Sequence, residues 1–345
     1  MTFTQIGFDF YFSKYRIEDS GLYLIRKKLF STTESFIKFE NIGSEIIKQK
    51  DRKYLWLFCS ILFLAIALYV FNRRLHDYKV GETAEIFHLC ISFFFCLVYQ
   101  FRSENKLILF KDENIKGIEF NGTIWYKKSL DQFVKHLLQS RDNYLKSKYP
   151  VIEGLTLDEI VNCMDAKLDP QDGLFLKRLT KHFVERLIFK GVRLDAENSS
   201  AICSLTTEKN ARKIISKHQD ELINAGKYIY ISGFSENKYK VTLIGTTSDP
   251  CKIMEHSGTN GGNYGIETED IVEKYKKWNK EFGVKTIGIG FDFCEFEIMN
   301  KEIDYKKLAT EVYEFCPDVV DQGTETIENL ENEIKKTGKI FLWWD

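Results

Sequence analysis

Proline is scarce in this sequence of 345 residues, which contains only 4. That scarcity excludes a proline-rich linker protein, and together with the mixed composition it excludes collagen-like and low-complexity arrays. Hydrophobic residues make up 44% of the chain, and phenylalanine alone occurs 28 times. A chain of this length and composition can build two or three domains, each with its own core.

The chain also lacks an excess of charge of either sign, with a formal net charge of −1. A protein that binds duplexes nonspecifically needs a basic excess to displace counterions, so no nucleic-acid partner is expected. The balance is uneven along the chain, however. Residues 227–345 contain 15 lysines and no arginine against 22 acidic residues, a net charge of −7. An acidic C-terminal part therefore follows a basic N-terminal part, and we expect the two to face different partners.

No CxxC pair occurs among the eight scattered cysteines. This absence argues against a zinc ribbon and against thioredoxin-like chemistry, and reduced thiols are expected. The sequence therefore predicts no metal and no cofactor.

Two long apolar runs stand out in the N-terminal half. Residues 54–71 are free of charge over a length that spans roughly 27 Å as a helix, close to a bilayer core. A second run at 86–101 is less uniform, because it contains His88. The pattern predicts a two-helix transmembrane hairpin, and basic residues beside its outer ends place both flanking parts in the cytoplasm of a bacterium, at the inner membrane. A helical hairpin buried in a large core is the alternative.

Strand-like stretches with alternating apolar residues flank this hairpin. Three precede it, between Gly7 and Ile42, and three follow it, between Lys106 and Lys128, before a helix that begins at Ser129. This order resembles a bacterial pleckstrin-homology-like domain split by an inserted hairpin, covering residues 1–149. The alternative is an unrelated small sheet.

The remainder is predicted as a helical connector, residues 150–204, with helices at 156–165 and 170–190 and a flexible joint at 195–200. A C-terminal sandwich of helices on a small mixed sheet follows, residues 205–345, which gives an α+β fold class overall. Its predicted helices include one at 207–225 and one that begins at Thr268 and ends before Gly283. Within the C-terminal part, the segments GTNGGNYGI (258–266), GIGFDFCEFE (288–297), YEFCPDVVDQG (313–323) and FLWWD (341–345) occur in this order. They resemble the bacterial domain-of-unknown-function family 4253. The resemblance transfers no activity; it implies a compact module found in settings suggestive of toxin immunity.

Candidate catalytic residues are few. Cys316 could act as a nucleophile with His256 as its base. It follows a helix C-terminus among acidic residues, which raises a thiol pKa, so a structural role is favoured. Asp292 and Glu295 lie on a predicted strand at 286–299 whose apolar parity changes, which indicates either a bulge near Cys294 or a strand buried on both faces. With Asp318 they could serve a hydrolase or a hard cation, although no EF-hand spacing is present.

Candidate binding residues fall into three groups. Trp343 and Trp344 point to opposite faces of the last strand, so one should be exposed beside Asp345. Asp318, Asp321 and Gln322 follow the helix that ends before Pro317. The glycine-rich loop at 258–265 contributes Asn260, Asn263 and Tyr264. We expect these groups to share one edge of the C-terminal part.

The leading hypothesis is therefore a noncatalytic, membrane-anchored, cytoplasm-facing binding protein. Its acidic C-terminal part would capture a protein partner, such as a basic toxin, as an immunity factor. The alternatives are a membrane-tethered hydrolase and a sensor that reads lipid through the basic half of the chain.

Overall fold

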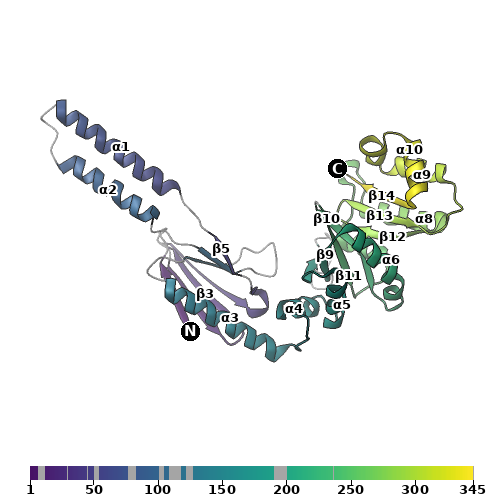
Figure 1. Cartoon of the computed structure of the whole chain (residues 1–345), viewed down its shortest axis with the longest axis horizontal. Coiled ribbons are helices and arrows are strands. Elements are labelled where there is room, and N and C mark those ends of the chain that lie inside the picture. Colours follow the sequence, from purple (N-terminus) through teal and green to yellow (C-terminus); the bar gives the residue numbers. More distant parts are fainter. Residues whose placement is uncertain are drawn as a thin grey trace. The chain divides into compact units, whose positions relative to one another are not determined.

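The computed structural model describes residues 1–6, 12–28, 30–44, 46–49, 54–76, 83–100, 105–108, 118–121, 127–189, 200–235 and 237–344. The chain forms two compact units, Met1–Tyr149 and Pro150–Asp345 (Figure 1). Each unit has buried clusters of its own and is described separately.

Two small antiparallel sheets form the N-terminal unit. The first is a meander of β1 (Thr2–Ile6), β2 (Phe12–Glu18), β3 (Gly21–Lys28) and β4 (Ser31–Lys38). The second joins β5 (Ile46–Gln49), β6 (Asn105–Ile108) and β7 (Ile118–Asn121). Helix α3 (Lys127–Lys148) packs its apolar stripe into the same core as both sheets, where Tyr15 and Phe120 lie with ring centroids 4.7 Å apart. Segments on either side of the two apolar runs thus share one core.

The apolar runs form α1 (Tyr54–His76) and α2 (Thr83–Gln100), which lie side by side in Figure 1. Ser60 Oγ donates to the Ser92 carbonyl at 3.0 Å, and Ser92 Oγ donates to the Ser60 carbonyl at 2.8 Å, so two polar side chains fix the register of the pair. Within the ranges that the structure describes, no helix has the length and apolarity to cross a membrane. A hydrocarbon core requires about 20 predominantly apolar residues in a row. The transmembrane hairpin at 54–71 and 86–101, and the inner-membrane location derived from it, are therefore wrong.

A seven-stranded mixed sheet organises the C-terminal unit, in the order β14-β13-β12-β10-β11-β9-β8 (Figure 1). Its strands are β8 (Glu185–Ile188), β9 (Ser200–Thr206), β10 (Tyr228–Ser235), β11 (Lys238–Ile244), β12 (Val284–Ile289), β13 (Phe293–Ile298) and β14 (Lys339–Trp343). Only the β10–β12 pair is parallel among these described strands.

Helices cover both faces of this sheet, because alternate residues of its strands are buried on opposite sides. On β10, Tyr228 and Tyr230 belong to one buried cluster, and Ile229 and Ile231 to the other. The first cluster contains residues of α7 (Pro250–Ser257), α8 (Thr268–Phe282), α9 (Tyr305–Phe315) and α10 (Ile327–Thr337); the second contains residues of α4 (Leu157–Asp165), α5 (Pro170–Thr180) and α6 (Glu208–Asn224). The unit is a mixed α/β sandwich of three layers.

The segment expected to be a helical connector, residues 150–204, is part of this sandwich. It supplies α4, α5, β8 and most of β9. The helix predicted at 170–190 ends at Thr180, because Lys181 takes the left-handed conformation (φ 65°) and caps it. The flexible joint expected at 195–200 lies outside the described residues apart from Ser200, which begins β9.

A hairpin replaces the continuous strand predicted at 286–299. β12 ends at Ile289 and β13 returns antiparallel from Phe293, so the change of apolar parity marks a turn and not a bulge near Cys294. The amide of Gly290 donates to the Phe293 carbonyl at 2.9 Å, and a Cβ at Gly290 would lie 2.0 Å from the Phe293 ring. The turn thus requires glycine at this position and presents Phe291 and Asp292.

Candidate protein-binding edge

The glycine-rich loop at 258–265 is fixed to the β12–β13 turn. The amide of Asn260 donates to the Phe291 carbonyl at 2.9 Å. Its side chain closes the loop on itself, since Nδ2 donates to the Gly258 carbonyl at 2.8 Å and Oδ1 accepts from the Gly262 amide at 3.0 Å. Asn260, predicted as a binding residue, therefore serves to shape the loop.

A turn of π-helix, Val319–Thr324, connects α9 to α10 beside this loop. Asp318, which precedes the turn, is only 2% exposed and accepts hydrogen bonds from Tyr264 Oη and, at 2.9 Å, from Gln322 Nε2. The bond to Asp318 raises the pKa of Tyr264 to about 12, because it favours the protonated phenol. Tyr264, Asp318 and Gln322, distant in sequence, are thus brought together as expected.

The two tryptophans at the end of β14 pack under this edge. Trp344 is 4% exposed and lies against Gly261, where a Cβ would come within 2.7 Å of its Cδ1. Trp343 is half-buried, and a Cβ at Gly323 would approach its ring to 2.9 Å. One tryptophan was expected to pack and the other to be exposed; Trp344 packs, but Trp343 is only partly exposed, because each ring covers a glycine of a neighbouring turn. Asp345, predicted beside it, lies outside the described residues.

The exposed aromatic groups of this edge are instead Tyr264, 44% exposed, and Phe291, 64% exposed. Asn263, Gln322 and the carboxylates of Asp292 and Asp321 are exposed on the same segments. We call the surface formed by Asn263, Tyr264, Phe291, Asp292, Asp321 and Gln322 the recognition edge. The sequence reasoning missed Phe291, because it placed this residue within a strand; the Gly290-Phe291-Asp292 order between two apolar runs was the available turn signal.

Cys316 and His256 do not form a catalytic pair. The Cys316 thiol is fully buried and donates to the Trp343 carbonyl at 2.9 Å, and burial raises its pKa to about 12. Burial lowers the pKa of His256, whose ring lies 5.8 Å from that of Phe189. In the described part of the chain no interaction joins the two side chains. This geometry gives no thiolate and no base positioned to generate one.

The carboxylates proposed for a hydrolase are also separated. Glu295 is buried on the face of the sheet that carries α6, where it forms an ion pair with Arg212 and lies 3.9 Å from Lys339 Nζ. Asp292 is exposed at the turn, whereas Asp318 is buried beneath Tyr264. Over the described ranges, no group of three histidine, cysteine or acidic residues is placed to hold a metal ion.

In a comparison with known protein families, residues 241–345 match the family described as a domain of unknown function (DUF4253). This supports the resemblance predicted for the C-terminal part, although the match begins within β11 and the folded unit begins at Pro150. No curated protein and no solved structure matches the chain. The resemblance of residues 1–149 to a pleckstrin-homology-like domain is therefore without support.

Proposed function

We propose that the C-terminal unit is a noncatalytic protein-binding module that captures a basic partner at the recognition edge. The observation that carries this proposal is the pair of exposed aromatic side chains, Tyr264 and Phe291, beside the exposed carboxylates of Asp292 and Asp321. Aromatic anchors surrounded by polar groups dominate the binding energy of many protein interfaces.

The framework beneath the edge supports this role because it is already ordered. Tyr264 is bonded to Asp318, Asn260 is bonded to the Phe291 backbone, and Trp344 donates its amide to the Asp292 carbonyl at 3.1 Å. A surface held in this way loses little conformational entropy on association. The anchors are therefore presented in one arrangement before a partner arrives.

Charge favours a basic partner. Residues 227–345 carry a net charge of −7, and the edge itself exposes two carboxylates beside its aromatic groups. A field of this sign accelerates encounters with a cationic protein. A basic toxin neutralised by this surface would make the protein an immunity factor, in keeping with the family resemblance of the C-terminal part.

Affinity capture with full-length protein tests the proposal. Wild type, Phe291→Ser and Phe183→Ser serve as parallel baits; Phe183 is an exposed phenylalanine elsewhere in the same unit and is the matched control. We expect wild type and Phe183→Ser to retain the same basic protein in comparable amounts, and Phe291→Ser to lose it. Equal retention by all three baits would remove the recognition edge as the binding surface.

A further inference from the structure

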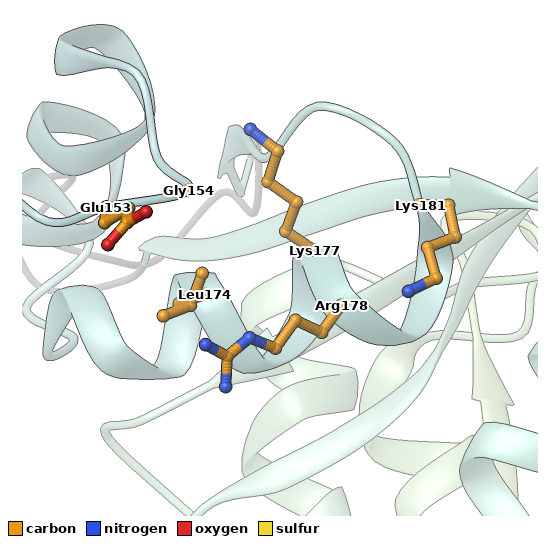
Figure 2. Close-up of a pocket in the computed structure, with 6 residues that line it drawn as sticks. All are labelled: Glu153, Gly154, Leu174, Lys177, Arg178 and Lys181. Atoms are coloured by element: carbon orange, nitrogen blue, oxygen red, sulfur yellow. The ribbon is translucent and has the colours of Figure 1, made fainter.

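A cavity of about 590 Å³ lies in the C-terminal unit and shares no lining residue with the recognition edge. It is lined by Glu153, Gly154, Leu174, Lys177, Arg178 and Lys181. Figure 2 shows Glu153 and Gly154 on one side of it, Lys177 and Arg178 extending from the last turn of α5, and Lys181 just beyond the end of that helix. Its volume is within the range that holds small-molecule ligands.

Lys177 is fixed and neutralised within this cavity. Its ammonium lies 2.6 Å from the carboxylate of Glu159, which is fully buried. The same carboxylate accepts hydrogen bonds from the backbone amides of Thr156, at 2.8 Å, and Val184, at 3.0 Å. The start of α4, the end of α5 and the approach to β8 are thereby held together, so the wall of the cavity is rigid.

Arg178 and Lys181 carry charge that is not compensated. Both side chains are exposed, and neither forms a hydrogen bond or an ion pair within the residues described by the structure. Lys181 also adopts a left-handed backbone (φ 65°), a conformation in which glycine is the favoured helix cap. A lysine at this position costs stability relative to glycine, and its side chain extends into the cavity lining.

The remaining lining residues complete a site with two ends. Leu174 gives an apolar wall, and Gly154 (φ 95°) borders it closely, since a Cβ there would lie 3.0 Å from Leu174 Cδ1. Glu153 contributes an exposed carboxylate on the opposite side from the cations. An occupant thus meets two cations at one end, an apolar surface in the middle and a hydrogen-bond acceptor at the other.

We propose that this cavity binds a small organic phosphomonoester that carries hydroxyl groups. Arg178 and Lys181 bind the phosphate, Leu174 contacts the body of the ligand, and Glu153 accepts a hydrogen bond from a hydroxyl. Two uncompensated cations match a phosphomonoester, whose charge is about −1.5 to −2 at neutral pH. The planar fork of arginine binds two phosphate oxygens at once, whereas the lysine supplies a point charge.

Isothermal titration calorimetry of the full-length protein with AMP and glucose 6-phosphate tests this proposal, with adenosine and glucose as the matched ligands without phosphate. We expect at least one phosphomonoester to bind roughly tenfold or more tightly than its dephosphorylated counterpart. If neither phosphomonoester binds more tightly than its counterpart, the proposal is wrong.

Variants locate the site. Replacing both cations, Arg178→Gln with Lys181→Gln, should weaken phosphomonoester binding by roughly tenfold or more. The matched control is Lys280→Gln with Lys306→Gln, which removes two exposed lysines far along the chain, one of them likewise in the last turn of a helix. Affinity that is unchanged in the first double variant, or equally reduced in both, would overturn the assignment.

Two further variants separate binding from folding. Glu153→Ala removes a nearby negative charge and also the acceptor for the hydroxyl of the ligand, so it should strengthen binding of inorganic phosphate and lower the affinity of the phosphomonoester relative to that of inorganic phosphate. Lys181→Gly should raise the thermal midpoint, since glycine suits the left-handed cap, and yet weaken phosphomonoester binding. If Lys181 has only a structural role, Lys181→Gly should raise the thermal midpoint without weakening phosphomonoester binding.

Discussion

Tyr264 donates its phenolic hydrogen to the buried carboxylate of Asp318, and this bond joins the glycine-rich loop to the π-helical turn that follows α9. The two residues are 54 positions apart in the sequence. Because Asp318 also accepts from Gln322, its carboxylate is the centre on which the recognition edge is assembled. Because the donor is the protonated phenol, the contribution of this bond to stability depends on pH.

Tyr264→Phe should destabilise the protein at pH 8 and lose this effect as the pH rises. The folded-state pKa of Tyr264 is raised from 10.0 to about 12, so the contribution of the bond is fully present below pH 10 and is lost between pH 10 and 12. Urea unfolding of wild type and variant across this range measures the difference. Tyr313→Phe is the control, and a difference that does not change with pH would contradict the prediction.

Cys316 should be unreactive in the folded protein. Its thiol is buried and bonded to the Trp343 carbonyl, and its pKa of about 12 leaves almost no thiolate at pH 8. Alkylation by iodoacetamide, followed by mass spectrometry of the peptides, should modify the exposed Cys90 first and Cys316 only on unfolding. If Cys316 is labelled as quickly as Cys90 in the folded state, a nucleophilic role must be reconsidered.

Cys316→Ala should lower the free energy of unfolding by about 1–3 kcal/mol, because it leaves a cavity and an unpaired carbonyl. Partner capture should be retained, since the thiol does not reach the surface. Chemical denaturation and the capture assay measure the two properties separately. Loss of capture in a variant that remains folded would assign Cys316 a role in binding.

Charge and aromatic contacts at the recognition edge should act on different rate constants. Asp292→Lys with Asp321→Lys should slow association with the basic partner and weaken its salt dependence. Phe291→Ala should mainly accelerate dissociation. If Phe291 is a buried anchor of the complex, its loss should weaken the free energy of binding by about 2 kcal/mol or more. Surface plasmon resonance resolves both rates. Unchanged kinetics in both variants, with the circular dichroism spectrum intact, would show that these side chains are solvated and take no part in binding.

The fragment 150–345 should fold on its own, whereas 205–345 should not. The shorter fragment lacks α4, α5, β8 and most of β9, which cover one face of the sheet and pair with β11. Ala201 and Ile202, both buried on β9, would be missing from the two cores that flank it. We expect a cooperative urea transition only for the longer fragment, and a comparable transition in both would show that the first two helices are dispensable.

Local chemistry in the sequence determined several elements closely. The helix predicted at 207–225 is α6 (Glu208–Asn224), with Thr207 as its N-cap, and the helix expected to end before Gly283 is α8, which that glycine caps in the left-handed conformation. The motifs of the C-terminal part likewise predicted a family resemblance over residues 205–345, of which the match covers 241–345. Caps, glycine stops and motifs depend on residues adjacent in the chain, so the sequence alone is sufficient for them.

Tertiary structure decided what depends on partners distant in the chain. Apolar periodicity shows that a residue is buried but not which residues bury it. It could not distinguish the turn at Phe291 from a continuous strand. Nor could it show that Trp344 packs on Gly261 and is not an exposed anchor. For the same reason the runs at 54–71 and 86–101 were read as membrane spans, and β8 and β9 as a connector. Pairing across a sheet and contact between loops join residues tens of positions apart, and only the folded chain brings Tyr264 to Asp318.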